Sequence, residues 1–173
     1  MKKESLLKIL PFLAILGSAV GVGTPLYFNS IYPNNGYWLF SVFSAVLCLF
    51  GLVFGYFGFV SGASLDKKFF KFMNKLGVNL PKITDKQVED SRIYIKIRGY
   101  LISTYGGILM AGLILLLVSK QTNYSTYLVL AIIAMIVGTL FAMLFLYYDY
   151  KMLKDRLPQL AFWQYIIFFA PIG

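Results

Sequence analysis

Charged residues are missing from three long stretches of this chain. None occurs between Ile9 and Leu65, between Gly99 and Ser119, or between Gln121 and Tyr148. A water-soluble domain of similar length needs polar surface throughout to cover its core, so these stretches exclude an ordinary soluble fold. An aromatic content of 18% and a mean hydropathy of +0.73 point the same way. We therefore predict a polytopic membrane protein.

Histidine is absent and there is a single cysteine. Histidine is the residue most often used for proton transfer near neutral pH, and it is the commonest metal ligand. Its absence, with no carboxylate inside the uncharged stretches, argues against a zinc site or a metalloprotease. The cysteine, Cys48, lies within an apolar stretch, where a lone thiol is ordinarily a small apolar side chain. We expect no enzymatic activity and no cofactor.

The remaining polar side chains offer little chemistry. Several serines of the apolar stretches have no nearby base in the sequence, and hydroxyls in membrane helices usually bond backbone carbonyls; these are Ser41, Ser44, Ser61 and Ser103. Proton and cation relays generally place charged side chains within the membrane, so ion-coupled transport is disfavoured. Asp149 follows the last uncharged stretch among tyrosines, and we expect it to contact lipid headgroups.

The uncharged stretches are long enough for four membrane crossings. A helix that crosses about 30 Å of hydrocarbon needs roughly 20 apolar residues. The first stretch accommodates two spans, because a cluster of Asn, Ser, Pro and Gly between Asn29 and Gly36 supplies a turn. We predict an all-α bundle of four transmembrane helices, a single integral membrane domain over 1–173, with spans at about 9–29, 37–62, 99–119 and 126–148.

Each end of the chain leaves an alternative open. Basic Lys2, Lys3 and Lys8 before an apolar run resemble a signal peptide, but the run is long and lacks a convincing cleavage site, which favours a first span. The uncharged C-terminal segment 157–173 is near the lower length limit for a span. Its prolines, glutamines and Trp and Tyr residues favour a short interfacial or re-entrant helix over a fifth span.

Basic residues predict the orientation. Lysine and arginine are retained in short loops on the cytoplasmic side, and every basic residue except Lys120 falls on one side if both termini are cytoplasmic. This bias explains the net charge of +9 without a polyanion, so nucleic-acid binding is not expected. The predicted location is the cell membrane, with cytoplasmic N- and C-termini.

The predicted cytoplasmic loop, 64–98, contains two helix patterns. Between Ser64 and Gly77 apolar residues recur on one helical face and lysines occupy the remainder, which is typical of a helix lying on a membrane. This amphipathic helix is either a plain elbow between two hairpins or a docking site for anionic lipid or a partner. The candidate contacts with anionic lipid, worth roughly 1 kcal/mol each, are Lys67, Lys68, Lys71 and Lys75.

A second helix pattern follows in the same loop. Thr84 and Gln87 match a capping box, which predicts a helix that begins near Asp85 and could continue straight into the third span. The acidic residues of its first turns and the basic residues after them suit the helix dipole. We interpret Glu89 with Lys96, and Asp85 with Glu89, as solvated surface and not as an acid and base.

Small residues recur at helical spacing in every predicted span. Within lipid, helices associate through packing at small-residue faces. The longest stripe, in the second span, is therefore a predicted groove, either for packing inside the bundle or for a helix of a partner; it comprises Gly51, Gly55, Gly58 and Gly62. In the first span, Pro25 predicts a kink or an unwound turn.

Three classes of function are compatible with these patterns. We favour a non-catalytic membrane protein acting through helix–helix and lipid contacts, as an accessory subunit of a membrane assembly or a bacterial self-protection protein of the immunity type. Its expected partners are the lipids of the anionic cytoplasmic leaflet and a membrane-protein partner or second copy. The alternative is a small transporter or channel subunit, with a polar cavity lined by Thr24, Asn29, Ser103 or Thr104. A membrane enzyme acting on lipid is the least favoured.

Overall fold

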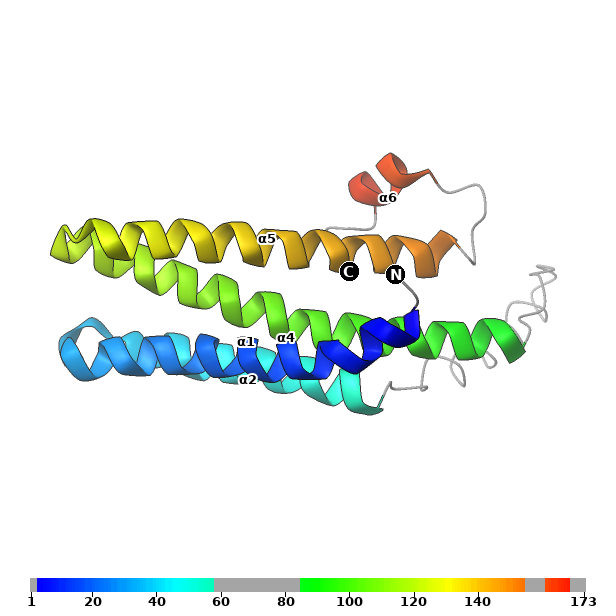
Figure 1. Ribbon diagram of the computed structural model, residues 1–173, viewed down its shortest axis with the longest axis horizontal. Helices are drawn as coiled ribbons and strands as arrows, with labels where there is room; N and C mark the ends of the chain where they lie inside the picture. Colours follow the sequence, from blue (N-terminus) through cyan, green and yellow to red (C-terminus); the bar gives the residue numbers. More distant parts are fainter. Residues whose placement is uncertain (1–2, 58–84, 155–160, 169–173) are drawn as a thin grey trace.

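The fold is an all-helical bundle in the part of the chain that the computed structural model describes, residues 3–57, 85–154 and 161–168 (Figure 1). No strand occurs within these ranges. Four of the helices are long and apolar enough to cross a membrane, which confirms the predicted four-span, multi-pass architecture. The elements are α1 (Lys3–Ile31), the 3-10 helix η1 (Pro33–Asn35), α2 (Tyr37–Phe57), α4 (Asp85–Thr122), α5 (Ser125–Lys154) and α6 (Phe162–Phe168).

Local sequence signals account for the connection between α1 and α2. The predicted turn separates these helices: η1 begins at Pro33, and Gly36 adopts a left-handed conformation with φ of 68°, which glycine tolerates because it has no Cβ. Helix α4, described from Asp85, continues into the third span without a break; Thr84 lies outside the described residues, so the capping box stays a prediction. The unwinding expected at Pro25 is not observed, because α1 remains helical on both sides of this proline.

Helix α4 is the centre of the bundle. It runs between α5 on one side and the α1–α2 pair on the other (Figure 1). In the most apolar 18-residue segment of α4, half of the residues are buried by the rest of the protein, compared with 17% in the corresponding segment of α5. Most of the surface of α5 is therefore available to lipid or to another protein, whereas α4 supplies the core.

Small residues let α4 approach its neighbours to backbone contact. A Cβ on Gly17 of α1 would lie 2.7 Å from the carbonyl oxygen of Thr104, and a Cβ on Gly107 would overlap the carbonyl oxygen of Gly17. On the other side, a Cβ on Gly99 would overlap the backbone nitrogen of Gly55 in α2. Such close approach suits helix association in lipid, where van der Waals packing has to replace hydrophobic exclusion.

Hydroxyl groups reinforce this packing, as the sequence predicted for membrane helices. Ser103 of α4 donates to the carbonyl oxygen of Cys48 in α2 over 2.7 Å. Ser41 of α2 donates to the carbonyl oxygen of Val22 in α1 over 3.0 Å. Each bond crosses a helix interface and satisfies a buried polar group, so α1, α2 and α4 form one interlocked unit.

The two ends of the bundle differ. The end that carries the first turns of α1 and the last turns of α5, here called the basic end, has a core cluster that includes Leu10, Tyr94 and Tyr148. At the opposite end, the η1 end, Gln121 accepts hydrogen bonds from Asn35 over 2.9 Å and from Tyr37 over 3.1 Å. These bonds tie the α1–α2 connection to the end of α4.

Candidate functional site

One charged side chain, Asp149 of α5, is buried among the described residues, and it lies at the basic end. Its carboxylate oxygen Oδ1 is 2.8 Å from Nη1 of Arg98 in α4. The second oxygen, Oδ2, accepts a hydrogen bond of 2.6 Å from the hydroxyl of Tyr165 in α6. These three residues, the Asp149 cluster, connect three helices through one carboxylate.

Hairpin geometry brings the ion pair together. Helices α4 and α5 are antiparallel and joined by the short turn at Asn123, whose φ of 56° is one that asparagine tolerates. Arg98 lies 24 residues before the end of α4 at Thr122 (122 − 98), and Asp149 lies 24 residues after the start of α5 at Ser125 (149 − 125). Residues equally far from a tight turn meet across the hairpin, so the two opposite charges meet.

The expected headgroup contact of Asp149 was wrong, since only 5% of its side chain is exposed. Sequence reasoning assigned no role to Arg98 beyond the helix dipole. In the structure 22% of its side chain is exposed, and its guanidinium lies 5.1 Å from the ring centre of Phe145. The equal spacing of the two residues from the α4–α5 turn is the sequence signal that could have revealed the pair.

Arg98 is only partly satisfied. Its Nη1 is bound by Asp149, but its Nε is buried and has no hydrogen-bond partner. The face of the Phe145 ring contributes a cation–π contact in its place. Removing Asp149 would therefore leave a largely buried cation without its counter-ion, which is far more costly than replacing both charges.

Tyr165 is a hydrogen-bond donor that does not ionise near neutral pH. Burial raises the pKa of its phenol well above the ordinary value, and the hydrogen bond to Asp149 and the negative charge of Asp149 raise it further. The positive charge of Arg98 opposes this effect in part. The phenol thus keeps the proton that it donates to Asp149.

Ring contacts complete the attachment of α6 to α5. Tyr150 of α5 lies 5.0 Å from Phe162 and 5.7 Å from Tyr165, measured between ring centres. At seven residues, α6 is much shorter than the roughly 20 residues of a span. It lies beside the last turns of α5 (Figure 1). The described part of 157–173 is thus a short helix bound to the bundle.

The predicted glycine groove is occupied by the chain itself where it is described. A Cβ on Gly51 would overlap Oγ of Ser103, and a Cβ on Gly55 would lie 2.5 Å from the ring of Tyr100. Both glycines therefore face α4. The other predicted site residues lie outside the described residues and stay predictions; these are Gly58, Gly62, Lys67, Lys68, Lys71 and Lys75.

Residues suggested for a polar cavity are engaged elsewhere. Ser103 donates across the α2–α4 interface, and Thr104 donates to the carbonyl oxygen of Tyr100 over 2.9 Å. Oδ1 of Asn29 accepts a hydrogen bond from the backbone of Trp38. Within the described ranges, Nε of Arg98 is the one buried side-chain nitrogen or oxygen without a hydrogen-bond partner.

In chemical terms, the Asp149 cluster is an ion pair whose carboxylate also accepts a hydrogen bond from a protonated phenol. Such a cluster is suited to holding helices together. Comparisons with protein-family models, curated proteins and solved structures found no match to this chain. Its function has to be argued from the geometry of its own residues.

Proposed function

We propose that this chain is a non-catalytic multi-pass protein of the cell membrane that acts by contact with a membrane-protein partner. It would serve either as an accessory subunit of a membrane assembly or as a bacterial self-protection protein of the immunity type. The observation that carries the proposal is that the polar groups inside the described bundle are used for internal bonds, Nε of Arg98 excepted. Such an interior favours function at the outer surface.

Helix α5 offers the surface for this contact. Its outward face is apolar and exposed along several turns, at Ile132, Ile136, Leu140 and Met143. Beside Ile136 lies a shallow apolar hollow of about 280 Å³, lined also by Met135, Thr139 and Leu140. The hydroxyl of Thr139 donates to the carbonyl oxygen of Met135 over 2.7 Å, so the hollow presents no free polar group to a partner. A side chain from a neighbouring helix would fit such a hollow.

Charge supports a cytoplasmic position for the basic end. Lys8, Arg92 and Lys151 lie in the helix turns at this end, whereas Lys120 lies at the η1 end. Under the positive-inside rule we expect the basic end, with the first turns of α1 and the last turns of α5, to face the cytoplasm.

The partner proposal can be tested by purification from the native membrane in a mild detergent, followed by mass spectrometry of whatever remains bound. Thr139→Phe fills the hollow on α5, and Leu49→Phe is the control, an added ring on the exposed face of α2. We expect a stoichiometric membrane protein with the wild type and Leu49→Phe, and its loss with Thr139→Phe. Recovery of the wild type only as a monomer or homo-oligomer would overturn the proposal that the chain is an obligate subunit. The alternative of a small transporter would then be tested by flux assays in liposomes.

A substitution in the predicted glycine groove, such as Gly55→Leu, does not test this surface. The Cβ alone would lie 2.5 Å from the Tyr100 ring, so the substitution would disturb packing between α2 and α4. Loss of a partner in that variant would report on the fold and not on the contact.

A further inference from the structure

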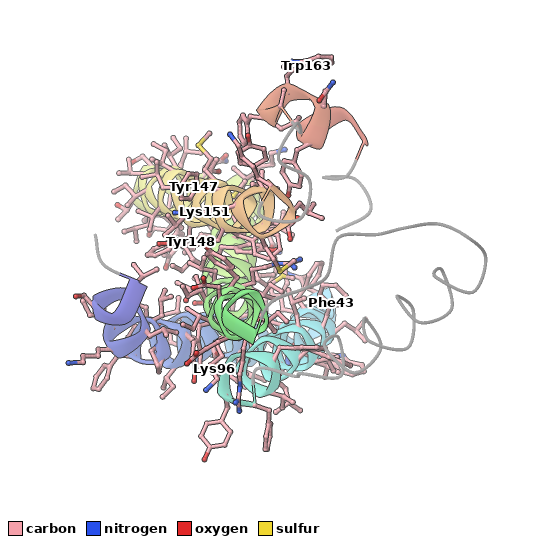
Figure 2. The ribbon with its side chains drawn as sticks, turned by 90° about the vertical axis from the view of Figure 1, so that its right-hand side faces the viewer. Phe43, Lys96, Tyr147, Tyr148, Lys151 and Trp163 are labelled. Carbon is pink, nitrogen blue, oxygen red and sulfur yellow. The ribbon has the colours of Figure 1, made fainter. Side chains whose placement is uncertain are left out.

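Helix α6 has an unusual distribution of side chains for a helix in water. The face towards the bundle carries Tyr165, which is 1% exposed and hydrogen bonded to Asp149. The outward side carries Trp163 and Ile166, which are 61% and 44% exposed, and Phe162, whose ring packs against Tyr150, is still 46% exposed. In Figure 2, Trp163 lies on the side of α6 that faces away from the bundle. An apolar surface so presented needs an apolar partner.

The contacts of α6 fix its depth relative to the membrane. It binds α5 at Asp149 and Tyr150, directly after the uncharged stretch that ends at Tyr148. Because α5 is a candidate span, this position is the boundary between hydrocarbon and headgroups. The outward face of α6 at that depth therefore lies in the headgroup region.

Two lysines at the same level match an anionic lipid surface. Nζ of Lys151 lies 5.9 Å from the ring centre of Tyr147, and Nζ of Lys154 lies 5.5 Å from that of Tyr150. Lysines that extend along aromatic rings at the end of a span typically place the ammonium group among headgroups. Tyr150 also contacts Phe162, so the charge of Lys154 lies close to α6, and Lys151 lies within one helix turn of Lys154 on α5.

We propose that α6 is a lipid-binding element: Trp163 and Ile166 insert into the leaflet at the basic end, and Lys151 and Lys154 contact its anionic headgroups. Tyr165 is a positioning residue. Its hydrogen bond to Asp149 determines which face of α6 points towards lipid. A helix of seven residues is not stable alone in water, so α6 depends on both its attachment to the bundle and its contact with lipid. This proposal is independent of a protein partner.

The test uses the fluorescence of Trp163 in the full-length chain reconstituted into vesicles of phosphatidylcholine and phosphatidylglycerol. The chain has two tryptophans, so Trp38→Phe leaves Trp163 as the only reporter. We expect the emission of Trp163 to be blue-shifted. Lipids brominated near the headgroup should quench it more strongly than lipids brominated near the end of the acyl chain. Quenching by aqueous acrylamide without quenching by brominated lipid would overturn the proposal.

Two sets of variants separate the positioning role from the lipid contact. Tyr165→Phe removes the hydrogen bond to Asp149, which is worth about tenfold in the ratio of bound to released α6, so lipid quenching of Trp163 should fall. Tyr124→Phe removes an exposed phenol at the η1 end, far from α6, and should change nothing. Equal quenching in the wild type and Tyr165→Phe would refute the positioning role.

The lysine contacts predict a dependence on lipid charge. Quenching of Trp163 should be stronger in vesicles with phosphatidylglycerol than in pure phosphatidylcholine, and this difference should vanish in Lys151→Gln/Lys154→Gln. If the double variant kept the full difference, the assignment of these lysines to headgroups would be wrong. Unchanged thermal unfolding of each variant serves as the folding control.

Discussion

Asp149 makes two bonds that differ in kind, and each can be removed separately. Asp149→Asn keeps an acceptor for Tyr165 but leaves the guanidinium of Arg98 without a counter-ion. We expect a loss of about 3 kcal/mol in the free energy of unfolding, the lower end for a buried pair because Arg98 is partly exposed. Thermal unfolding in detergent can be followed by a thiol-reactive dye, since the one cysteine, Cys48, is buried.

A charge-free double variant is the control for this prediction. Arg98→Met/Asp149→Leu replaces both charges by apolar side chains, so no cation is left unpaired, and it should be more stable than Asp149→Asn. If the double variant were the less stable of the two, the cost of Asp149→Asn would not come from an unpaired cation, contrary to this prediction.

Tyr165 predicts how the attachment of α6 depends on pH. Its pKa in the folded protein is raised above the ordinary value of 10.0. A group whose folded pKa is raised contributes stability that is fully present below its unfolded pKa and is lost as pH rises through the folded pKa. The attachment should thus be insensitive to pH from neutral to about pH 10 and weaken only in stronger alkali.

Tyrosinate absorbance at 295 nm checks this prediction. Wild type and Tyr165→Phe should show the same increase through the range in which exposed tyrosines ionise, because Tyr165 is still protonated there. A smaller increase in Tyr165→Phe within that range would show that this phenol ionises normally and is not held by Asp149.

At the level of helices, α4 is in backbone contact with both α1 and α2. Gly107→Ala should push α1 away, because the new Cβ would overlap the carbonyl oxygen of Gly17, and we expect a cost of about 1–3 kcal/mol. Gly23→Ala is the matched control, since no atom lies within 4 Å of its added Cβ. Comparable unfolding temperatures for the two variants would show that α1 and α4 are not in backbone contact.

Sequence signals for the helices varied in how much they could predict. A helix pattern that runs on from the loop into the third span is confirmed from Asp85 onwards, whereas the capping box itself lies partly outside the described residues. Pro25 did not unwind α1, which stays helical through this proline. The glycine stripe predicted close packing but could not identify the neighbour, since small faces serve internal and external contacts alike.

Across the whole molecule, the missing charges were enough to predict four apolar helices, because the length of an uncharged run is a local property of the sequence. The candidate site was not predicted. Arg98 and Asp149 are far apart in the chain and come together only through the register of the α4–α5 hairpin. Local composition suggested headgroup contact for Asp149, but this carboxylate is enclosed by α4 and α6.

Orientation can be tested on the entire protein in intact cells. In a Cys48→Ser background, Tyr124→Cys places a thiol on an exposed position at the η1 end, and Lys154→Cys places one at the basic end. A membrane-impermeant maleimide should label Tyr124→Cys from outside and Lys154→Cys only after the membrane is opened. The reverse pattern would contradict the proposed cytoplasmic termini.

Crosslinking in the native membrane tests the partner proposal most directly. A photoreactive phenylalanine derivative would replace Ile136 on the outward face of α5 or, as the control, Leu49 on the exposed face of α2. The account predicts an adduct with one defined membrane protein from position 136 and only lipid adducts from position 49. Lipid adducts alone from both positions would contradict the claim that α5 is a contact surface for a partner.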